Sequence, residues 1–261
     1  MKLCTPIYTT FGLRESKKTA VVISPVMPAW DAGAFLAPLT DELVRIGYLV
    51  VVVDSLSILN KTIEALEGLI YHWHNFLKDF RNVDLLVGCA LGGTIVQGLL
   101  RSSWAKRIPK VLLLSAPTKS DEILNRRLGL MSDLAGAQRI NEAIALLNQL
   151  VLPAHKAHVR IEDMSVSYGE GAEACFRLET GFRLLINVDM TPWVESYDGL
   201  LLSIYGQQSQ LVRDVNIVIR NSEKQRSVSI INGGMRPLAD CPKTVFSEMR
   251  THLGIEVGEV A

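Results

Sequence analysis

The chain has no excess of charge of either sign and no long hydrophobic run. Its 261 residues carry 27 Lys and Arg against 27 Asp and Glu, so no bulk field attracts nucleic acid or an acidic membrane surface. The longest apolar runs, such as "YLVVVVD" and "VLLLSAP", are too short to span a bilayer. The first residues lack the basic-then-apolar profile of a secretory signal. We therefore expect a cytoplasmic protein with no nucleic-acid or membrane partner.

Cysteine and histidine are also sparse, and their spacing indicates no metal site. The four cysteines are scattered without metal-ligand spacing or a compact disulfide pattern: Cys4, Cys89, Cys175 and Cys241. His72 and His74 are two residues apart on an expected helix, so they face different sides. His155 and His158 are three apart, but the sequence offers no further ligands for zinc. We predict reduced cysteines, no metal and no cofactor.

Apolar and β-branched residues are plentiful, and they alternate with helical patterns. The runs "KTAVVISPV", "YLVVVVD", "VDLLVGCA" and "KVLLLSAP" are typical of buried parallel strands, and the stretches between them have helical spacing. Such βα units form a parallel sheet with helices on both faces. Residues 120–189 are mostly helical in pattern, before strand signals resume at "LLLSIYG" and "SVSIING". The sequence predicts an α/β core of residues 1–119 and 190–261, interrupted by a helical insert at 120–189.

One turn in this layout carries a specific pattern. Residues 84–93 read "DLLVGCALGG", a buried strand that runs into glycines and then a helix. Together with the order of elements, this stretch resembles the α/β-hydrolase fold with a helical cap, over roughly residues 19–254. The most similar members are small carboxylesterases and acyl-thioesterases, such as the pimeloyl-carrier-protein methyl ester esterases. The resemblance implies a strained strand-to-helix turn, the elbow (residues 88–92), where flanking glycines permit a tight backbone.

The resemblance also implies three catalytic positions, and each holds a residue unsuited to the reaction. The nucleophile position falls on Ala90, which has no oxygen with which to form an acyl intermediate. The acid position, in "IYGQQSQLV", falls on Ser209, and the histidine position, in "INGGMRPLADCP", falls on Met235. Loss of all three favours natural degeneracy over a variant made by one substitution, which would leave the acid and the histidine in place.

The loops around these positions predict an apolar pocket. The His-Gly pair usual in the oxyanion loop is replaced by Ser24-Pro25, and proline has no N–H to donate, although Val26 and Leu91 still offer theirs. Besides Ala90 and Met235, we expect the pocket to be lined by Pro25, Val26, Met27, Trp30, Cys89, Leu91, Trp193 and Pro237. Such a pocket either holds an acyl or aromatic group or has filled in with core side chains.

Two further residues are candidates for chemistry outside the triad positions. Cys89 stands in the elbow next to Ala90, but a reactive thiolate needs a nearby base or positive site, and its place in the turn favours packing instead. Asp121 follows a central strand, where some hydrolases carry their acid. Without a base it is better interpreted, with Ser120, as a helix cap.

Three functional hypotheses follow. The chain is a pseudo-hydrolase that binds a small acyl or aromatic ligand without cleaving it, or a non-catalytic protein partner of an enzyme in the same pathway. Alternatively it is an active carboxylesterase or acyl-thioesterase, seen as a Ser-to-Ala variant or using a different site. A deep apolar pocket favours the first hypothesis, and a large interface favours the second. A serine, a histidine and a carboxylate within hydrogen-bond reach would favour the third.

Overall fold

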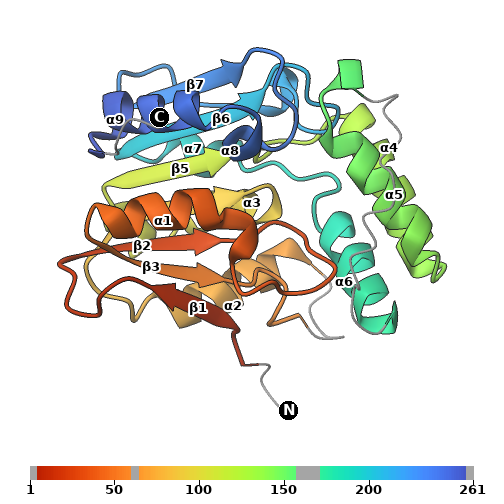
Figure 1. Ribbon diagram of the computed structural model, residues 1–261, viewed down its shortest axis with the longest axis horizontal. Coiled ribbons are helices and arrows are strands. Elements are labelled where there is room, and N and C mark those ends of the chain that lie inside the picture. Colours follow the sequence, from red (N-terminus) through yellow and green to blue (C-terminus); the bar gives the residue numbers. More distant parts are fainter. Residues whose placement is uncertain (1–4, 60–64, 157–170, 257–261) are drawn as a thin grey trace.

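A computed structural model describes residues 5–59, 65–156 and 171–256 of the chain. Seven strands form one sheet in the order β1-β3-β2-β4-β5-β6-β7 (Figure 1). The strands are β1 (Tyr8–Phe11), β2 (Lys18–Ile23), β3 (Tyr48–Val53), β4 (Val83–Cys89), β5 (Lys110–Leu114), β6 (Leu200–Gly206) and β7 (Gln225–Ile230). Neighbouring strands run parallel, except that β1 pairs antiparallel with β3. The predicted α/β class with a mostly parallel sheet is confirmed.

Helices cover both faces of this sheet. They are α1 (Ala37–Arg45), α2 (Leu66–Leu77), α3 (Leu91–Leu99), α4 (Glu122–Gly136), α5 (Ile140–Val151), α6 (Gly171–Arg183), α7 (Thr191–Glu195), α8 (Pro237–Asp240) and α9 (Pro242–Leu253). Side chains alternate along each buried strand, so Ala20 and Val22 pack in one core cluster with α1 and α9. Val21 and Ile23 pack in the other cluster with α2 and α3. This two-sided burial explains why the central strands are apolar at nearly every position.

The helical insert, α4 to α6, lies at the carboxyl ends of the parallel strands, on the right of Figure 1. An isolated bridge between Lys119 and Asp189 joins the two ends of the insert. Within the insert that the sequence predicts to be mostly helical, residues 121–151 form two helices, because Gln138 adopts a φ of 60° between them. The insert therefore folds back on itself above the sheet edge, where the elbow also lies. Its treatment as a separate domain stays a prediction, and residues 157–170 of it lie outside the described part.

Two sets of contacts hold the insert to the sheet. On one flank, Arg177 of α6 donates two hydrogen bonds to the carboxylate of Asp54, at 3.0 and 2.8 Å, and its Nε donates to the carbonyl of Met27 at 3.0 Å. On the other flank, the N–H of Met235 donates to the carbonyl of Val151 at 3.0 Å. The side chain of Gln210 also donates to carbonyls at the end of α5. The loops after β6 and β7 thus support the insert.

Candidate ligand-binding site

The elbow has the strained backbone that the sequence predicts. Ala90 stands between β4 and α3 with φ 47° and ψ −114°, a conformation that costs a non-glycine residue about 1–3 kcal/mol. A Cβ on Gly88 would lie 2.4 Å from the Cα of Gly93, and one on Gly92 would lie 2.1 Å from the carbonyl oxygen of Ile23. Any side chain at these two positions would therefore meet backbone, so the tight turn requires both glycines.

The loop at the histidine position brings Met235 to the same region as Ala90. Both residues line one cavity. The sulfur of Met235 lies 3.5 Å from the backbone nitrogen of Val212, and the N–H of Gly234 donates to Asp240 at 2.7 Å. A Cβ on Gly234 would lie 2.6 Å from the carbonyl oxygen of Val151. A thioether neither accepts nor returns a proton at neutral pH, so this loop supplies an apolar wall and no base.

Ser209, at the acid position, is buried and does not line the cavity. It follows β6 in a turn in which its N–H donates to Gly206 at 3.1 Å. The residue is 6% exposed, and its hydroxyl has no hydrogen-bond partner within the described ranges. A serine hydroxyl cannot stabilise an imidazolium as a carboxylate does. The structure therefore brings Ala90 and Met235 together at the cavity. Ser209 is buried outside the cavity lining.

The cavity between the elbow and the helical insert has a volume of about 600 Å³. The core side contributes the loop after β2, the elbow and the loops after β6 and β7. Of the predicted lining, six residues besides Ala90 and Met235 are present: Pro25, Val26, Met27, Trp30, Cys89 and Pro237. The pocket is open at this elbow, not filled in with core side chains.

Two predicted lining residues lie elsewhere. Leu91 is fully buried in the core beneath the elbow, because one step along a helix turns its side chain by about 100° from Ala90. Trp193 lies on α7, which packs against α3, and the side chain is 37% exposed. Its neighbour Val194 is the residue of α7 that faces the core, at 0% exposure. Neither Leu91 nor Trp193 belongs to the cavity.

The insert contributes lining residues that sequence reasoning missed. They come from all three helices: Leu124, Leu128, Ile144, Leu147, Asn148, Val151, Phe182 and Leu185. Positions 124 and 128 on α4, and 144, 147 and 151 on α5, are apolar at spacings of three and four residues, which is the signal of an apolar helix face. That signal shows that a face is buried. It does not show which face of which helix meets the elbow.

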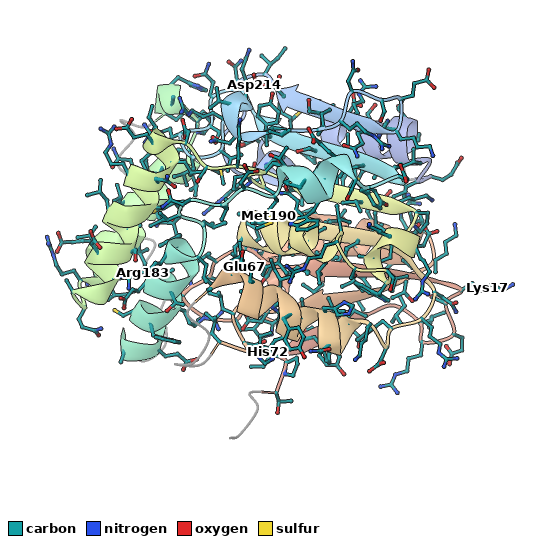
Figure 2. All side chains as sticks on the ribbon, turned by 180° about the vertical axis from the view of Figure 1, so that it is seen from behind. Lys17, Glu67, His72, Arg183, Met190 and Asp214 are labelled. Carbon is teal, nitrogen blue, oxygen red and sulfur yellow. The ribbon has the colours of Figure 1, made fainter. Side chains whose placement is uncertain are left out.

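The cavity holds little that could perform acid–base or nucleophilic chemistry. Cys89 is 6% exposed, and burial raises the pKa of its thiol to about 12, so the neutral thiol predominates at physiological pH. None of the histidines that the structure describes lines the cavity. His72 and His74 lie on α2, His155 lies in the short helix Ala154–Lys156, and His252 bonds two backbone carbonyls from α9. Figure 2 shows His72 on α2, away from α4 and α5. His158 lies outside the described residues.

Asp121 acts as the predicted helix cap. Its side chain accepts a hydrogen bond from the N–H of Leu124 at 3.0 Å, at the start of α4, and also pairs with Arg213 and Asn216. These hydrogen bonds and the Arg213 charge lower the pKa of the carboxyl group against the opposing effect of burial. An ionised cap of this kind fits a structural role better than that of a catalytic acid.

Across the described ranges, no three side chains of the metal-ligating types come together as a metal site. Across the same ranges, no helix combines the length and the apolar character needed to cross a membrane.

Comparison with solved structures identifies the fold. The chain is similar to MGS-M2, an alpha/beta hydrolase enzyme from a Medee basin deep-sea metagenome library, with a TM-score of 0.77 at 12% identity over 98% of this chain and 96% of that one. It is similar to a bromoperoxidase from Bacillus anthracis, with a TM-score of 0.74 at 16% identity over 95% and 94% of the two chains. The esterase EaEST from Exiguobacterium antarcticum gives a TM-score of 0.71 at 12% identity over 95% of each chain.

These likenesses establish that the chain has the α/β-hydrolase fold, as the sequence predicts. No protein-family model matches the chain, and no curated protein matches it either. At such low identity the shared feature is the fold, and function has to be argued from the site itself.

Proposed function

We propose that this protein binds a small ligand with an acyl chain or aromatic group in the cavity between the elbow and the helical insert, without hydrolysing it. The observation that carries the proposal is an apolar cavity of about 600 Å³ that reaches the elbow at Ala90, where the side chain is a methyl group. This volume lies within the range of about 300–1,000 Å³ typical of small-molecule sites.

The residues around Ala90 support binding over catalysis. Acyl transfer needs a nucleophile within hydrogen-bond reach of a base. Ala90 and Met235 supply neither, and Cys89, whose pKa is raised to about 12, has no histidine beside it in the described lining. The alternative of an active carboxylesterase or thioesterase therefore has the fold in its favour but no set of reacting groups.

A role as a protein partner has less support. Large exposed apolar side chains in the described ranges are distributed over separate elements, with Tyr8 on β1, Tyr71 on α2, Leu130 on α4 and Trp193 on α7. Singly exposed apolar residues are common on monomeric proteins. The apolar cavity at the elbow is the more specific feature.

Titration with N-phenyl-1-naphthylamine, a neutral fluorescent apolar probe, tests the binding proposal. We expect saturable binding that weakens by about tenfold or more in Leu147→Trp, which fills the cavity from α5. The matched variant Ala145→Trp places the same side chain on the exposed face of α5, and its affinity should stay within about twofold of the unaltered chain. Absence of saturable binding, or equal affinity in the two variants, would contradict the proposal.

Turnover of p-nitrophenyl esters and acyl-thioesters tests the second half of the proposal. We expect none from the unaltered chain. A variant that carries Ala90→Ser, Ser209→Asp and Met235→His should gain activity if the three positions are correctly assigned. Turnover by the unaltered chain above the level of a mock purification would overturn the non-catalytic assignment.

A further inference from the structure

We infer that the ligand of this cavity is a monocarboxylate, whose apolar tail lies in the cavity and whose carboxylate binds Arg236 at the mouth. The inference rests on the proposed binding function and adds the chemical class of the ligand. It comes from the distribution of charge over the lining, where only Asp31 and Arg236 among the described residues carry a formal charge.

The carboxylate of Asp31 is already satisfied by the protein. One of its oxygens accepts a hydrogen bond from the N–H of Gly33 at 2.9 Å, and the other accepts one from the N–H of Phe35 at 2.7 Å. Both bonds serve the turn that leads into α1. Asp31 thus stabilises the turn. Because both of its oxygens already accept hydrogen bonds, it attracts a cation less strongly than a free carboxylate would.

The guanidinium of Arg236, in contrast, has no carboxylate partner in the part of the chain that the structure describes. It lies over the ring of Phe35, with its central carbon 5.8 Å from the ring centroid. Asp240, four residues further on, accepts instead from the N–H of Gly234. The five N–H donors of an arginine fork therefore remain available to a ligand at the mouth of the cavity.

The backbone around Arg236 is fixed, which gives this charge a defined place. Its carbonyl accepts hydrogen bonds from the N–H groups of Ala239 and Asp240, at 2.9 and 2.8 Å. Met235 before it is bonded to the end of α5, and Pro237 after it is buried in the cavity wall. Arg236 therefore begins at the cavity lining and reaches towards solvent beside Phe35, which is 41% exposed.

An amphipathic acid matches this arrangement. Its tail gains from leaving water for an apolar cavity, and its head stays at the mouth, where a planar guanidinium can donate two parallel hydrogen bonds to a carboxylate. One unpaired positive charge suits a monoanion better than a phosphate monoester, which carries about −1.5 to −2 charges at neutral pH. A cationic head group would be repelled.

Displacement of N-phenyl-1-naphthylamine at neutral pH by decanoic acid, decanamide and decyl phosphate tests the inference. We expect decanoic acid to bind about tenfold more tightly than decanamide and more tightly than decyl phosphate. Added salt should reduce the preference for the acid, because the attraction at an exposed mouth is screened. Equal affinity of acid and amide, or tighter binding of the phosphate, would overturn the inference.

The variant Arg236→Gln tests whether Arg236 causes the preference for the acid over the amide. We expect this variant to bind the acid about tenfold more weakly while it binds the neutral probe and the amide as before. Arg107→Gln is the matched control, since Arg107 is an exposed arginine of the short helix 105–107, outside the cavity lining. A preference for the acid that persists in Arg236→Gln would overturn the assignment. Failure of the neutral probe itself to bind the unaltered chain would overturn the binding function as well.

Discussion

Cys89 and Ala90 are neighbours on one turn, but their side chains have different surroundings. Cys89 packs in the core cluster on one face of the sheet and only touches the cavity, whereas Ala90 is partly open to it. The loss of hydration raises the pKa of the Cys89 thiol to about 12. A thiol becomes a nucleophile only as it ionises, so this residue is unreactive at neutral pH although it lies in the elbow.

We predict that Cys241 is alkylated by iodoacetamide before Cys89. Cys241 is partly exposed and Cys89 is buried, and the raised pKa leaves very little Cys89 thiolate at neutral pH. Alkylation of Cys89 should accelerate as the pH rises towards its pKa, or when urea unfolds the chain. Peptide mapping by mass spectrometry resolves the sites, and rapid alkylation of Cys89 in the folded protein at neutral pH would contradict the prediction.

At the scale of residues, the sequence predicted the parts of the site that are local. Gly88, Gly92 and Ala90 lie within five positions, and the geometry of a tight turn depends on those positions alone. The expectation that Trp193 lines the cavity is wrong. On the short helix α7 the next residue, Val194, points into the core, so the side chain of Trp193 points outward. Phe182 was missed because its place depends on how the insert packs.

Among the ion pairs that the structure describes, that of Asp54 and Arg177 is the most deeply buried. Asp54 follows β3 directly and is 0% exposed, and Arg177 on α6 is 6% exposed. Removing two charges from water is costly, and the bidentate geometry and the further bond to Met27 offset that cost. Loss of one partner would strand the other charge in the interior.

We predict that Arg177→Met lowers the free energy of unfolding by about 3–5 kcal/mol, because the Asp54 carboxylate is then buried without a positively charged partner. Arg183→Met is the matched control on the same helix. In its salt bridge with Glu179 the side chain of Arg183 is 61% exposed, so the loss should be below about 1 kcal/mol. Urea denaturation measures both changes. Adding Asp54→Leu to Arg177→Met should recover much of the stability, and similar losses in the two single variants would contradict the prediction.

Elements with strong periodicity were predicted from the sequence, and those set by tertiary contacts were not. The parallel strands are continuous apolar runs, which one sequence reveals. The edge strand β1 is half exposed, with Tyr8 and Thr9 showing no apolar run, so its pairing with β3 had no such signal. The break between α4 and α5 depends on Gln138 in a left-handed conformation, which its residue type does not require.

In the whole molecule, the helical insert is attached to the sheet on both of its flanks. Arg177 joins α6 to the end of β3, and the end of α5 is bonded to the loops that follow β6 and β7. The loops that carry the acid and the histidine in the resembling hydrolases serve here as supports. An insert held in this way should not unfold independently of the core.

We predict that the core and the insert unfold in one transition. Tryptophan fluorescence reports on the core, since the four tryptophans lie outside residues 120–189, and far-UV circular dichroism also reports on α4 to α6. The two urea curves should coincide for the unaltered chain. Separate transitions in the unaltered chain would show that the insert is an independent unit.

The attachment of the insert on both flanks has a consequence for time scales. A ligand inside the cavity lies beneath helices that cannot lift away without breaking a buried ion pair and several backbone hydrogen bonds. The exposed residues Phe35 and Arg236 lie at the edge of this cavity, away from those attachments. For the ligand that we propose, release therefore requires the tail to leave the apolar cavity without help from movement of the insert. We expect such a complex to dissociate slowly.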